Sequence, residues 1–278
     1  MLYGIKFVAS YLAGTDIAGR NLMVHPDDTF ITSYPRSGNT WTRFLIANLL
    51  HPDRRVTFAN IESLIPDATV LSSRSIKRIP RPRLIKSHEY FDPRYPRVIY
   101  LVRDPRDVAL SLYHARRKYR SIDDSYPLER FVSERFLPGD LDLPWSEHVG
   151  SWLATRRNHP AFLLVRYEDL LEDPARELRR MAVFLGVVAD AETLRRAIER
   201  STAQRLRDLE KVEHEQWLGT RGKRADIPFI GEATAGGWKQ RLPASSLALI
   251  ESRWAHLMNT LGYDTSTAPV ANTRVITG

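Results

Sequence analysis

Residues 32–41 read TSYPRSGNTW and decide the predicted fold. They follow the apolar run Thr29–Ile31 and precede Trp41–Leu49, a segment with helical apolar spacing, so a strand, a tight turn and a helix are predicted. Backbone N–H groups at a helix start carry partial positive charge, and such a loop can hold an anion. The nucleoside-triphosphate pattern G-x-x-x-x-G-K-[ST] is incomplete, because its first glycine is absent and no lysine stands between Gly38 and Thr40. We therefore expect the loop to hold a phosphate, but not the end of an ATP.

Several other short apolar segments alternate with helical patterns. This alternation predicts the α/β class, a three-layer αβα fold with a central parallel sheet and right-handed crossovers. Ligands in such sheets bind beyond the carboxyl ends of the strands. The expected strands are Thr29–Ser33, Arg83–Lys86, Val98–Val102 and Phe162–Val165, and the expected helices are Asn39–Leu50, Pro105–Lys118, Trp145–Arg157, Ala175–Leu185 and, near the end, Ala244–Leu261.

Composition narrows the classes of function. The chain has 278 residues and no cysteine, which excludes disulfide scaffolds, Cys-ligated zinc and a cysteine nucleophile. A formal charge of +8 suggests an anionic partner such as nucleic acid, a membrane surface or a phosphorylated small molecule. The densest basic cluster, residues 74–86, is broken by prolines and has no interleaved aromatics, so we expect a solvated loop there and no nucleic-acid binding.

The two ends of the chain bear on domains and location. The apolar N-terminal stretch MLYGIKFVASYLAG is shorter than the ~20 residues that a membrane span needs, and it lacks a clear signal-peptide pattern. We expect a cytoplasmic protein without membrane association. Residues 1–264 are predicted to form a single domain and residues 265–278 a poorly ordered tail.

Two further stretches carry polar groups at predicted strand ends. In VIYLVRDPRDVALSLYH, residues 98–114, Asp104 can cap the next helix, and Arg103 and Ser111 can face one anion. Taken by itself, this stretch is better explained by a capped helix with a surface arginine and a buried serine. In PRLIKSHEYF, residues 82–91, Lys86 and His88 leave the same sheet edge, where a lysine can neutralise a phosphate and a histidine can take a proton.

Together these stretches resemble the sulfotransferase family, in particular the cytosolic type that uses 3′-phosphoadenosine 5′-phosphosulfate (PAPS). TSYPRSGNTW is similar to the family loop TYPKSGTTW, PRLIKSHEYF to PRLIKTHLP, and FIGEATAGGWKQRL to FIRKGKVGDWKNHF. The matches occur in the family's order between residues 32 and about 242. The resemblance implies a sheet and phosphate loop like those of P-loop nucleotide kinases.

The resemblance also implies a role for each matched residue. The 5′-phosphosulfate is expected at the phosphate loop and the 3′-phosphate at Arg103 and Ser111, with His88 as the base and Lys86 as a bridge to the transferred group. Arg36 is expected to stabilise the leaving phosphate. The implied catalytic residues are His88, Lys86 and Arg36, and the implied cofactor-binding residues are Arg36, Ser37, Gly38, Asn39, Thr40, Trp41, Arg103, Ser111, Tyr167 and Ser201.

The chain departs from the family pattern in four places. Arg36 replaces a lysine and cannot act as an acid, since an arginine pKa lies above ~12. The family's Arg-Lys-Gly clamp on the 3′-phosphate falls at residues 231–233, Gly-Glu-Ala, where Glu232 repels a phosphate; the basic run 221–224 is a substitute by guess. A second adenine-stacking aromatic is missing near Ala203, and the family's dimerisation motif is absent from residues 239–248.

We therefore expect a sulfotransferase that uses PAPS and no metal, and that acts on a hydroxyl or amine of a small-molecule acceptor. A P-loop kinase-like phosphotransferase is one alternative, and a non-catalytic anion-binding module is another. His88 argues against simple binding, which needs no base. Candidate residues for the acceptor pocket are Phe91, Tyr113, His114, Trp145 and Trp152, with core packing as the alternative for the two tryptophans. His114 is also a reserve candidate for the base.

Overall fold

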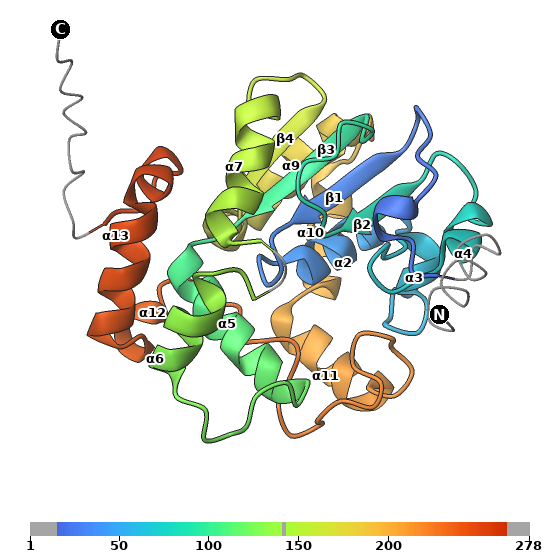
Figure 1. Ribbon diagram of the computed structural model, residues 1–278. Helices are drawn as coiled ribbons and strands as arrows, with labels where there is room; N and C mark the ends of the chain where they lie inside the picture. The colour runs from blue at the N-terminus through green and yellow to red at the C-terminus, as the bar shows by residue number, and fades with distance from the viewer. Residues whose placement is uncertain (1–15, 141–142, 266–278) are drawn as a thin grey trace, which may run out of the picture.

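The computed structural model describes residues 16–140 and 143–265. Its centre is a parallel four-stranded sheet in the order β2-β1-β3-β4 (Figure 1). The strands are β1 (Thr29–Ser33), β2 (Leu84–Ser87), β3 (Arg97–Val102) and β4 (Phe162–Arg166). Pairing of Thr32 with Ser87, Ser33 with Leu101, and Val102 with Arg166 brings the four carboxyl ends to one edge.

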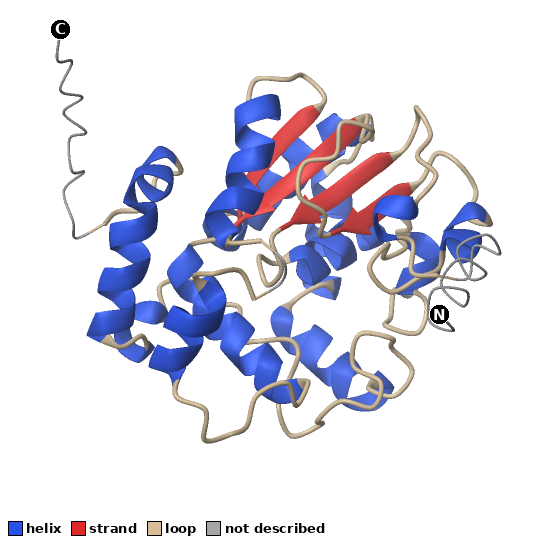
Figure 2. Cartoon of the chain, in the orientation of Figure 1, coloured by secondary structure: helices blue, strands red, loops and turns tan. Residues whose placement is uncertain are grey.

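Helices follow the strands and surround the sheet (Figure 2). They are α2 (Asn39–Leu50), α3 (Ile61–Leu64), α4 (Ser73–Lys77), α5 (Pro105–Lys118), α6 (Leu128–Phe131), α7 (Trp145–Arg156), α8 (Tyr167–Glu172), α9 (Pro174–Leu185), α10 (Ala191–Arg200), α11 (Ala203–Glu213), α12 (Trp238–Arg241) and α13 (Ala244–Thr260), with a 3-10 turn η1 (Gly19–Asn21) and a π-helical turn η2 (Val132–Phe136).

Alternation along β3 divides the core into two layers. Val98, Tyr100 and Val102 face a cluster that includes residues of α5, α7 and α13. Ile99 and Leu101 face the other cluster, which includes residues of α2, α9 and α10. Because successive side chains of a strand point to opposite faces, one buried strand supports both layers. The predicted three-layer αβα fold with a central parallel sheet is confirmed.

Local signals set the helix boundaries that matter for the site. Asp104 accepts a hydrogen bond from the Arg106 N–H, and Pro105 occupies the first turn of α5, as predicted. Helix α2 begins differently, after Gly38 in the left-handed conformation (φ 92°) and without a side-chain cap. The start of α2 therefore leaves its first N–H groups without an internal acceptor.

Most predicted elements agree with the structure within one residue, and the differences have local reasons. Helices α2 and α5 span the predicted residues, while β2 lies one residue later than predicted. The prediction of a solvated loop for the basic cluster 74–86 is wrong. This segment contains most of α4 and of β2, and Arg83 within it is buried against Asp28 (2.6 Å). Residues 1–15 and 266–278, which include most of the predicted tail, lie outside the described residues.

Candidate active site

A cavity of about 880 Å³ opens where the carboxyl ends of the strands meet. Figure 1 shows α5, α11 and the chain that follows α11 beyond this edge of the sheet. Predicted site residues that line the cavity are Arg36, Gly38, Asn39, Thr40, Trp41, Lys86, His88, Arg103, Ser111 and Tyr167. The fold thus brings together three motifs that lie far apart in sequence.

The phosphate loop, residues 34–38, has a backbone that few side chains tolerate. Arg36 has φ 69° and Gly38 φ 92°, both in the left-handed region. A Cβ at Gly38 would lie 2.5 Å from Cδ2 of Tyr167, so only glycine fits between the loop and that ring. Among the described residues, the N–H groups of residues 36–40 find no backbone acceptor. Together with the start of α2, they form a concave set of donors suited to a phosphate.

Arg36 bridges the phosphate loop to two other segments. Its Nε donates to Oγ of Ser111 (3.0 Å), and its Nη2 donates to the carbonyl of Phe229 (3.0 Å). The Arg36 guanidinium also lies 4.5 Å from the centre of the Phe229 ring. Both hydrogen-bond acceptors are neutral, and within residues 16–140 and 143–265 no carboxylate forms an ion pair with Arg36. The positive charge of Arg36 is therefore left for an anionic ligand.

Arg103, Tyr167 and Trp41 form the wall next to the loop. The Arg103 guanidinium lies 4.3 Å over the Tyr167 ring and donates to the carbonyls of Arg36 (3.3 Å) and Thr234 (3.1 Å). The rings of Trp41 and Tyr167 pack edge to face, with their centres 6.0 Å apart. Within residues 16–140 and 143–265, Nε of Arg103 and Nε1 of Trp41 are buried and find no hydrogen-bond partner. Since buried polar atoms are normally paired, these groups mark a place that a polar ligand can occupy.

His88 is held in the tautomer that a general base requires. Its Nδ1 lies 2.8 Å from the backbone carbonyl of Ser33, which can only accept, so neutral His88 carries its proton on Nδ1. Nε2 is then left with its lone pair. Burial, together with the nearby charge of Lys86, lowers the pKa of His88 to about 3, although Asp67 opposes this shift. His88 is therefore an uncharged base at neutral pH.

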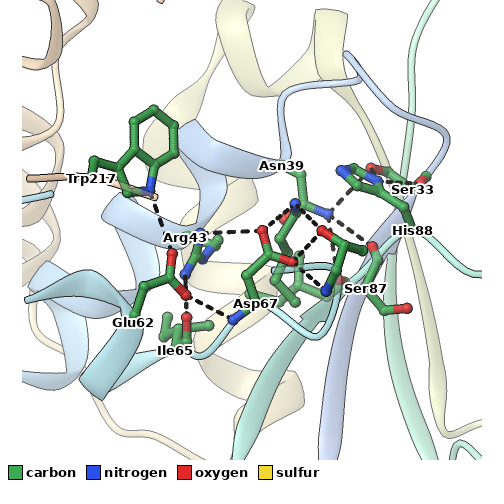
Figure 3. A network of polar contacts seen from close by, with 12 residues as sticks. Ser33, Asn39, Arg43, Glu62, Ile65, Asp67, Ser87, His88 and Trp217 are labelled. Carbon is green, nitrogen blue, oxygen red and sulfur yellow. Dashed lines mark hydrogen bonds and ion pairs between the residues drawn. The ribbon is translucent and has the colours of Figure 1, made fainter. Parts of the chain in front are cut away.

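Lys86 belongs to a buried network, of which Asp67, Arg43, Glu62 and Trp217 are labelled in Figure 3. Its Nζ lies 2.5 Å from Oδ2 of Asp67, and Arg43 approaches the same oxygen at 4.0 Å. Arg43 also pairs with Glu62 (3.0 Å), which accepts from Nε1 of Trp217 (3.4 Å). Burial would raise the pKa of Asp67, but the charges of Lys86 and Arg43 outweigh burial and hold that pKa well below its usual value.

In this network Lys86 is the ion-pair partner of Asp67, and not a cation left unpaired for the ligand. Burial lowers the pKa of Lys86, and the Asp67 carboxylate opposes this. Asp67 lines the cavity and was missed by the motif comparison. Its signal in the sequence is a single acid within the apolar stretch SLIPDATV, residues 63–70.

The side chain of Asn39 is already engaged in bonds within the protein. Its Nδ2 donates to the carbonyl of Ile31 (3.3 Å) and to Oγ of Ser33 (3.2 Å).

Two predicted serines do not line the cavity. Ser37, within the phosphate loop, has a fully buried side chain. Ser201 is fully buried after α10, where its hydroxyl donates to the carbonyl of Ala197 (2.8 Å) and accepts from Nδ2 of Asn48 (3.0 Å). These two bonds connect α10 with α2, so the structure does not bring Ser201 to the other predicted site residues.

The far side of the cavity is formed by the facing loop, residues 214–237, between α11 and α12. Asp107 of α5 accepts from the N–H groups of Gly236 (2.7 Å) and Trp238 (2.9 Å), which fixes the end of the loop. Within the basic run 221–224, Lys223 lines the cavity, whereas Arg224 pairs with Asp124 and Asp226. The guess that this run replaces the missing phosphate clamp is thus left to Lys223.

The residues predicted for the acceptor pocket do not all line the cavity. His114 lines the cavity, and burial followed by the charge of Arg241 lowers its pKa. Trp145 and Trp152 are fully buried in the core layer of α7, in agreement with the packing alternative.

Comparison with known proteins decides the family. The family model described as sulfotransferase domain matches residues 26–262, which is most of the chain. The chain belongs to the sulfotransferase family. Sulfotransferase 1B1 of Canis lupus familiaris is 29% identical over 231 residues, 77% of each chain, and sulfotransferase 1A1 of Mus musculus is 26% identical over 276 residues, 92% of each. The family resemblance read from the motifs is confirmed, and the protein is a sulfotransferase enzyme.

Solved sulfotransferase-fold structures agree with this architecture. A retinol dehydratase in complex with androsterone and the inactive cofactor PAP has a TM-score of 0.71 at 23% identity, covering 94% of this chain and 87% of that one. A mouse sulfotransferase in complex with PAP has a TM-score of 0.71 at 22% identity and covers 87% of both chains. At these identities the likeness concerns the fold.

Residues 16–140 and 143–265 contain neither a candidate metal site nor a candidate membrane span. No group of three or more His, Asp or Glu side chains there is arranged to hold a metal ion. No helix in that part of the chain is long and apolar enough to cross a membrane.

Proposed function

We propose that this sulfotransferase transfers the sulfuryl group of PAPS to a hydroxyl, or to an amine, of a small molecule. PAP is bound in both solved neighbours named above, and androsterone in one of them, which motivates the choice of cofactor and of a small-molecule acceptor. The observation that carries the proposal is His88, an uncharged base with a free Nε2 in the cavity that the phosphate loop also lines.

The residues present fit a nucleotide with phosphate groups at both ends. The open N–H groups of residues 36–40 suit the 5′-phosphosulfate, and Arg103 with Ser111 suits the 3′-phosphate. Trp41 and Tyr167 offer aromatic surfaces for the adenine. Ser201 is left out of the proposal, because its hydroxyl is committed to Ala197 and Asn48. When bound, PAPS supplies an activated sulfuryl group on a phosphate leaving group.

His88 would take the proton from the attacking group of the acceptor. Nε2 gains that proton while Nδ1 keeps its bond to the carbonyl of Ser33, so the ring does not have to turn. A ring that is neutral above about pH 3 is ready to accept the proton at any physiological pH. Asp67 favours the imidazolium that forms, since its carboxylate acts to raise the pKa of His88.

Two cations would stabilise the charge that develops on the leaving phosphate, and they differ in strength. Lys86 shares its charge with Asp67 at 2.5 Å, whereas Arg36 contacts neutral oxygens. Arg36 is therefore the stronger electrostatic group, and Lys86 acts mainly as a positioned donor. Arg36 cannot supply a proton at these pH values, so any protonation of the leaving group comes from solvent or from Lys86.

A direct test combines a screen with one substitution. The protein is incubated with PAPS, without added metal, and pooled phenols, steroids, sugars and peptides, and sulfated products are sought by mass spectrometry. The same pools with ATP and magnesium test for phosphoryl transfer, and phosphorylated products there would contradict the proposal. His88→Ala should lower kcat by about 10²–10⁴-fold while PAP binding, followed by calorimetry, stays within a few-fold. Full activity of His88→Ala would remove His88 as the base, and His256→Ala, an exposed histidine of α13, is the matched control.

A further inference from the structure

The facing loop, residues 214–237, contains no helix or strand up to α12, and four of its backbone groups are bonded by two buried charges. The two charges belong to Lys118, the last residue of α5, and Glu210, in the last turn of α11. Their side chains are 1% and 6% exposed, and Nζ of Lys118 lies 3.2 Å from Oε1 of Glu210. A buried ion pair is costly unless further hydrogen bonds complete it, so the bonds it makes indicate what it is for.

Lys118 holds the middle of the loop. Its Nζ donates to the carbonyls of Arg224 (2.8 Å) and Ile227 (2.6 Å), and its own carbonyl accepts from the N–H of Arg224 (3.2 Å). Nε2 of His214 lies 3.5 Å from the same Nζ. A loop lacks the ladder bonds of a helix or sheet, so the donor for these part-buried carbonyls has to come from a side chain.

Glu210 holds two residues a little further along the loop. Its Oε1 accepts from the N–H of Phe229 (2.6 Å), and its Oε2 accepts from the N–H of Ile230 (2.9 Å). Both oxygens of the carboxylate are therefore used on consecutive N–H groups. This arrangement fixes the direction of the peptide unit between Phe229 and Ile230, and with it the carbonyl of Phe229.

The carbonyl of Phe229 is the acceptor for Nη2 of Arg36 (3.0 Å), and the Phe229 ring packs 4.5 Å from that guanidinium. A continuous set of contacts thus runs from the buried pair through one residue of the facing loop to the cation of the phosphate loop. The neighbouring segment 231–233 offers no cation of its own, because it reads Gly-Glu-Ala.

We propose that Lys118 and Glu210 form a positioning clasp for Arg36. The clasp fixes Phe229, and Phe229 fixes the guanidinium in the place where it meets the 5′-phosphate of the nucleotide. This inference rests on the proposed role of Arg36 in the transfer. Lys118 and Glu210 do not touch the nucleotide and act only through the facing loop.

The decisive experiment is a double-mutant cycle on PAP affinity, which needs no turnover. Glu210→Gln keeps the shape of the side chain, but its amide offers one acceptor oxygen for two N–H groups and removes the partner charge of Lys118. We expect the Kd of PAP to rise about tenfold in the otherwise unchanged chain. In the Arg36→Lys background, the forked guanidinium that bonds the carbonyl of Phe229 is absent. There the same substitution should raise Kd less than about twofold.

Two companion measurements separate positioning from general loss of structure. Asp208→Asn changes an exposed acid on the same helix, paired there with Lys211, and should leave PAP affinity and thermal stability unchanged. If Glu210→Gln does not fold, Glu210→Asp takes its place, because it keeps the charge and withdraws it by one methylene. Hydrogen exchange should rise at Phe229 and Ile230 in either variant and stay unchanged in the sheet.

Each contrary outcome has a distinct meaning. An unchanged Kd in Glu210→Gln, or an equal fold-loss in both Arg36 backgrounds, would overturn the clasp and leave the pair as a support of the loop alone. Failure of the unaltered chain to bind PAP would overturn the cofactor assignment itself and the clasp with it. The two failures are therefore distinguishable in one series of titrations.

Discussion

The phosphate loop and the facing loop lie on opposite sides of one cavity, and they treat their backbone groups in opposite ways. In the phosphate loop and the start of α2, the N–H groups of residues 36–40 find no backbone acceptor within the described chain. In the facing loop, the N–H groups of Phe229 and Ile230 and the carbonyls of Arg224 and Ile227 are all bonded to the side chains of Glu210 and Lys118. Open donors mark where a ligand binds, and saturated ones mark the part that supports it.

The largest expected effect comes from breaking the support. Lys118→Met leaves two part-buried carbonyls without their donor and Glu210 as a buried, unpaired charge. Removal of one partner of a buried pair costs about 3–5 kcal/mol, so the free energy of unfolding should fall by that order. Denaturant unfolding measures this change. Lys211→Met, an exposed lysine of α11, is the matched control and should change stability by less than about 0.5 kcal/mol. An equally stable Lys118→Met protein would contradict the view that the facing loop depends on the hydrogen bonds of Lys118.

Substitution in the open loop should act on binding more than on stability. Gly38→Ala places a Cβ 2.5 Å from Cδ2 of Tyr167 at a φ of 92°, so either the ring or the loop has to move. A left-handed conformation alone costs a non-glycine residue about 1–2 kcal/mol. We expect PAP binding to weaken by at least about tenfold, measured by calorimetry. Gly150→Ala in α7, where a Cβ meets nothing within 4 Å, is the control. Unchanged PAP affinity would show that the donors of the loop are not the binding surface.

The sequence predicted the open region far better than the saturated one, for a physical reason. Strand ends, a Gly-containing turn and the Asp-Pro cap of α5 are local signals, and a parallel sheet then brings their side chains to one edge. Lys118 and Glu210 are separated by 92 positions, and in the sequence each reads as one more charged residue on an amphipathic helix. Asp67 was missed because a single acid has no periodicity. Ser201 was chosen by motif alone, and its burial depends on how α10 packs against α2.

The pH dependence of stability provides a separate test of His88. Its pKa is about 3 in the folded chain and about 6.5 when unfolded, so the unfolded state binds more protons between these values. Stability contributed by His88 is therefore fully present above about pH 6.5 and is lost as pH falls toward 3, by up to about 1.4 kcal/mol per pH unit. His148, whose burial lowers its pKa to about 4, acts in the same direction. Denaturant unfolding of His88→Gln between pH 4 and 7 should show a flatter slope than the unaltered chain. Equal slopes would mean that His88 is not held neutral.

The smallest effect is expected where the two regions meet, at Arg36→Lys. Both residues carry a positive charge, and neither is glycine, so the backbone at φ 69° is no more strained after the change. A lysine cannot donate to both Oγ of Ser111 and the carbonyl of Phe229 in the forked geometry of Arg36. If Arg36 acts through its charge, kcat/KM for PAPS should stay within about tenfold, whereas Arg36→Ala should lose about 10²–10³-fold. A lysine variant as poor as the alanine variant would show that the fork itself, and so the contact with the facing loop, is required for catalysis.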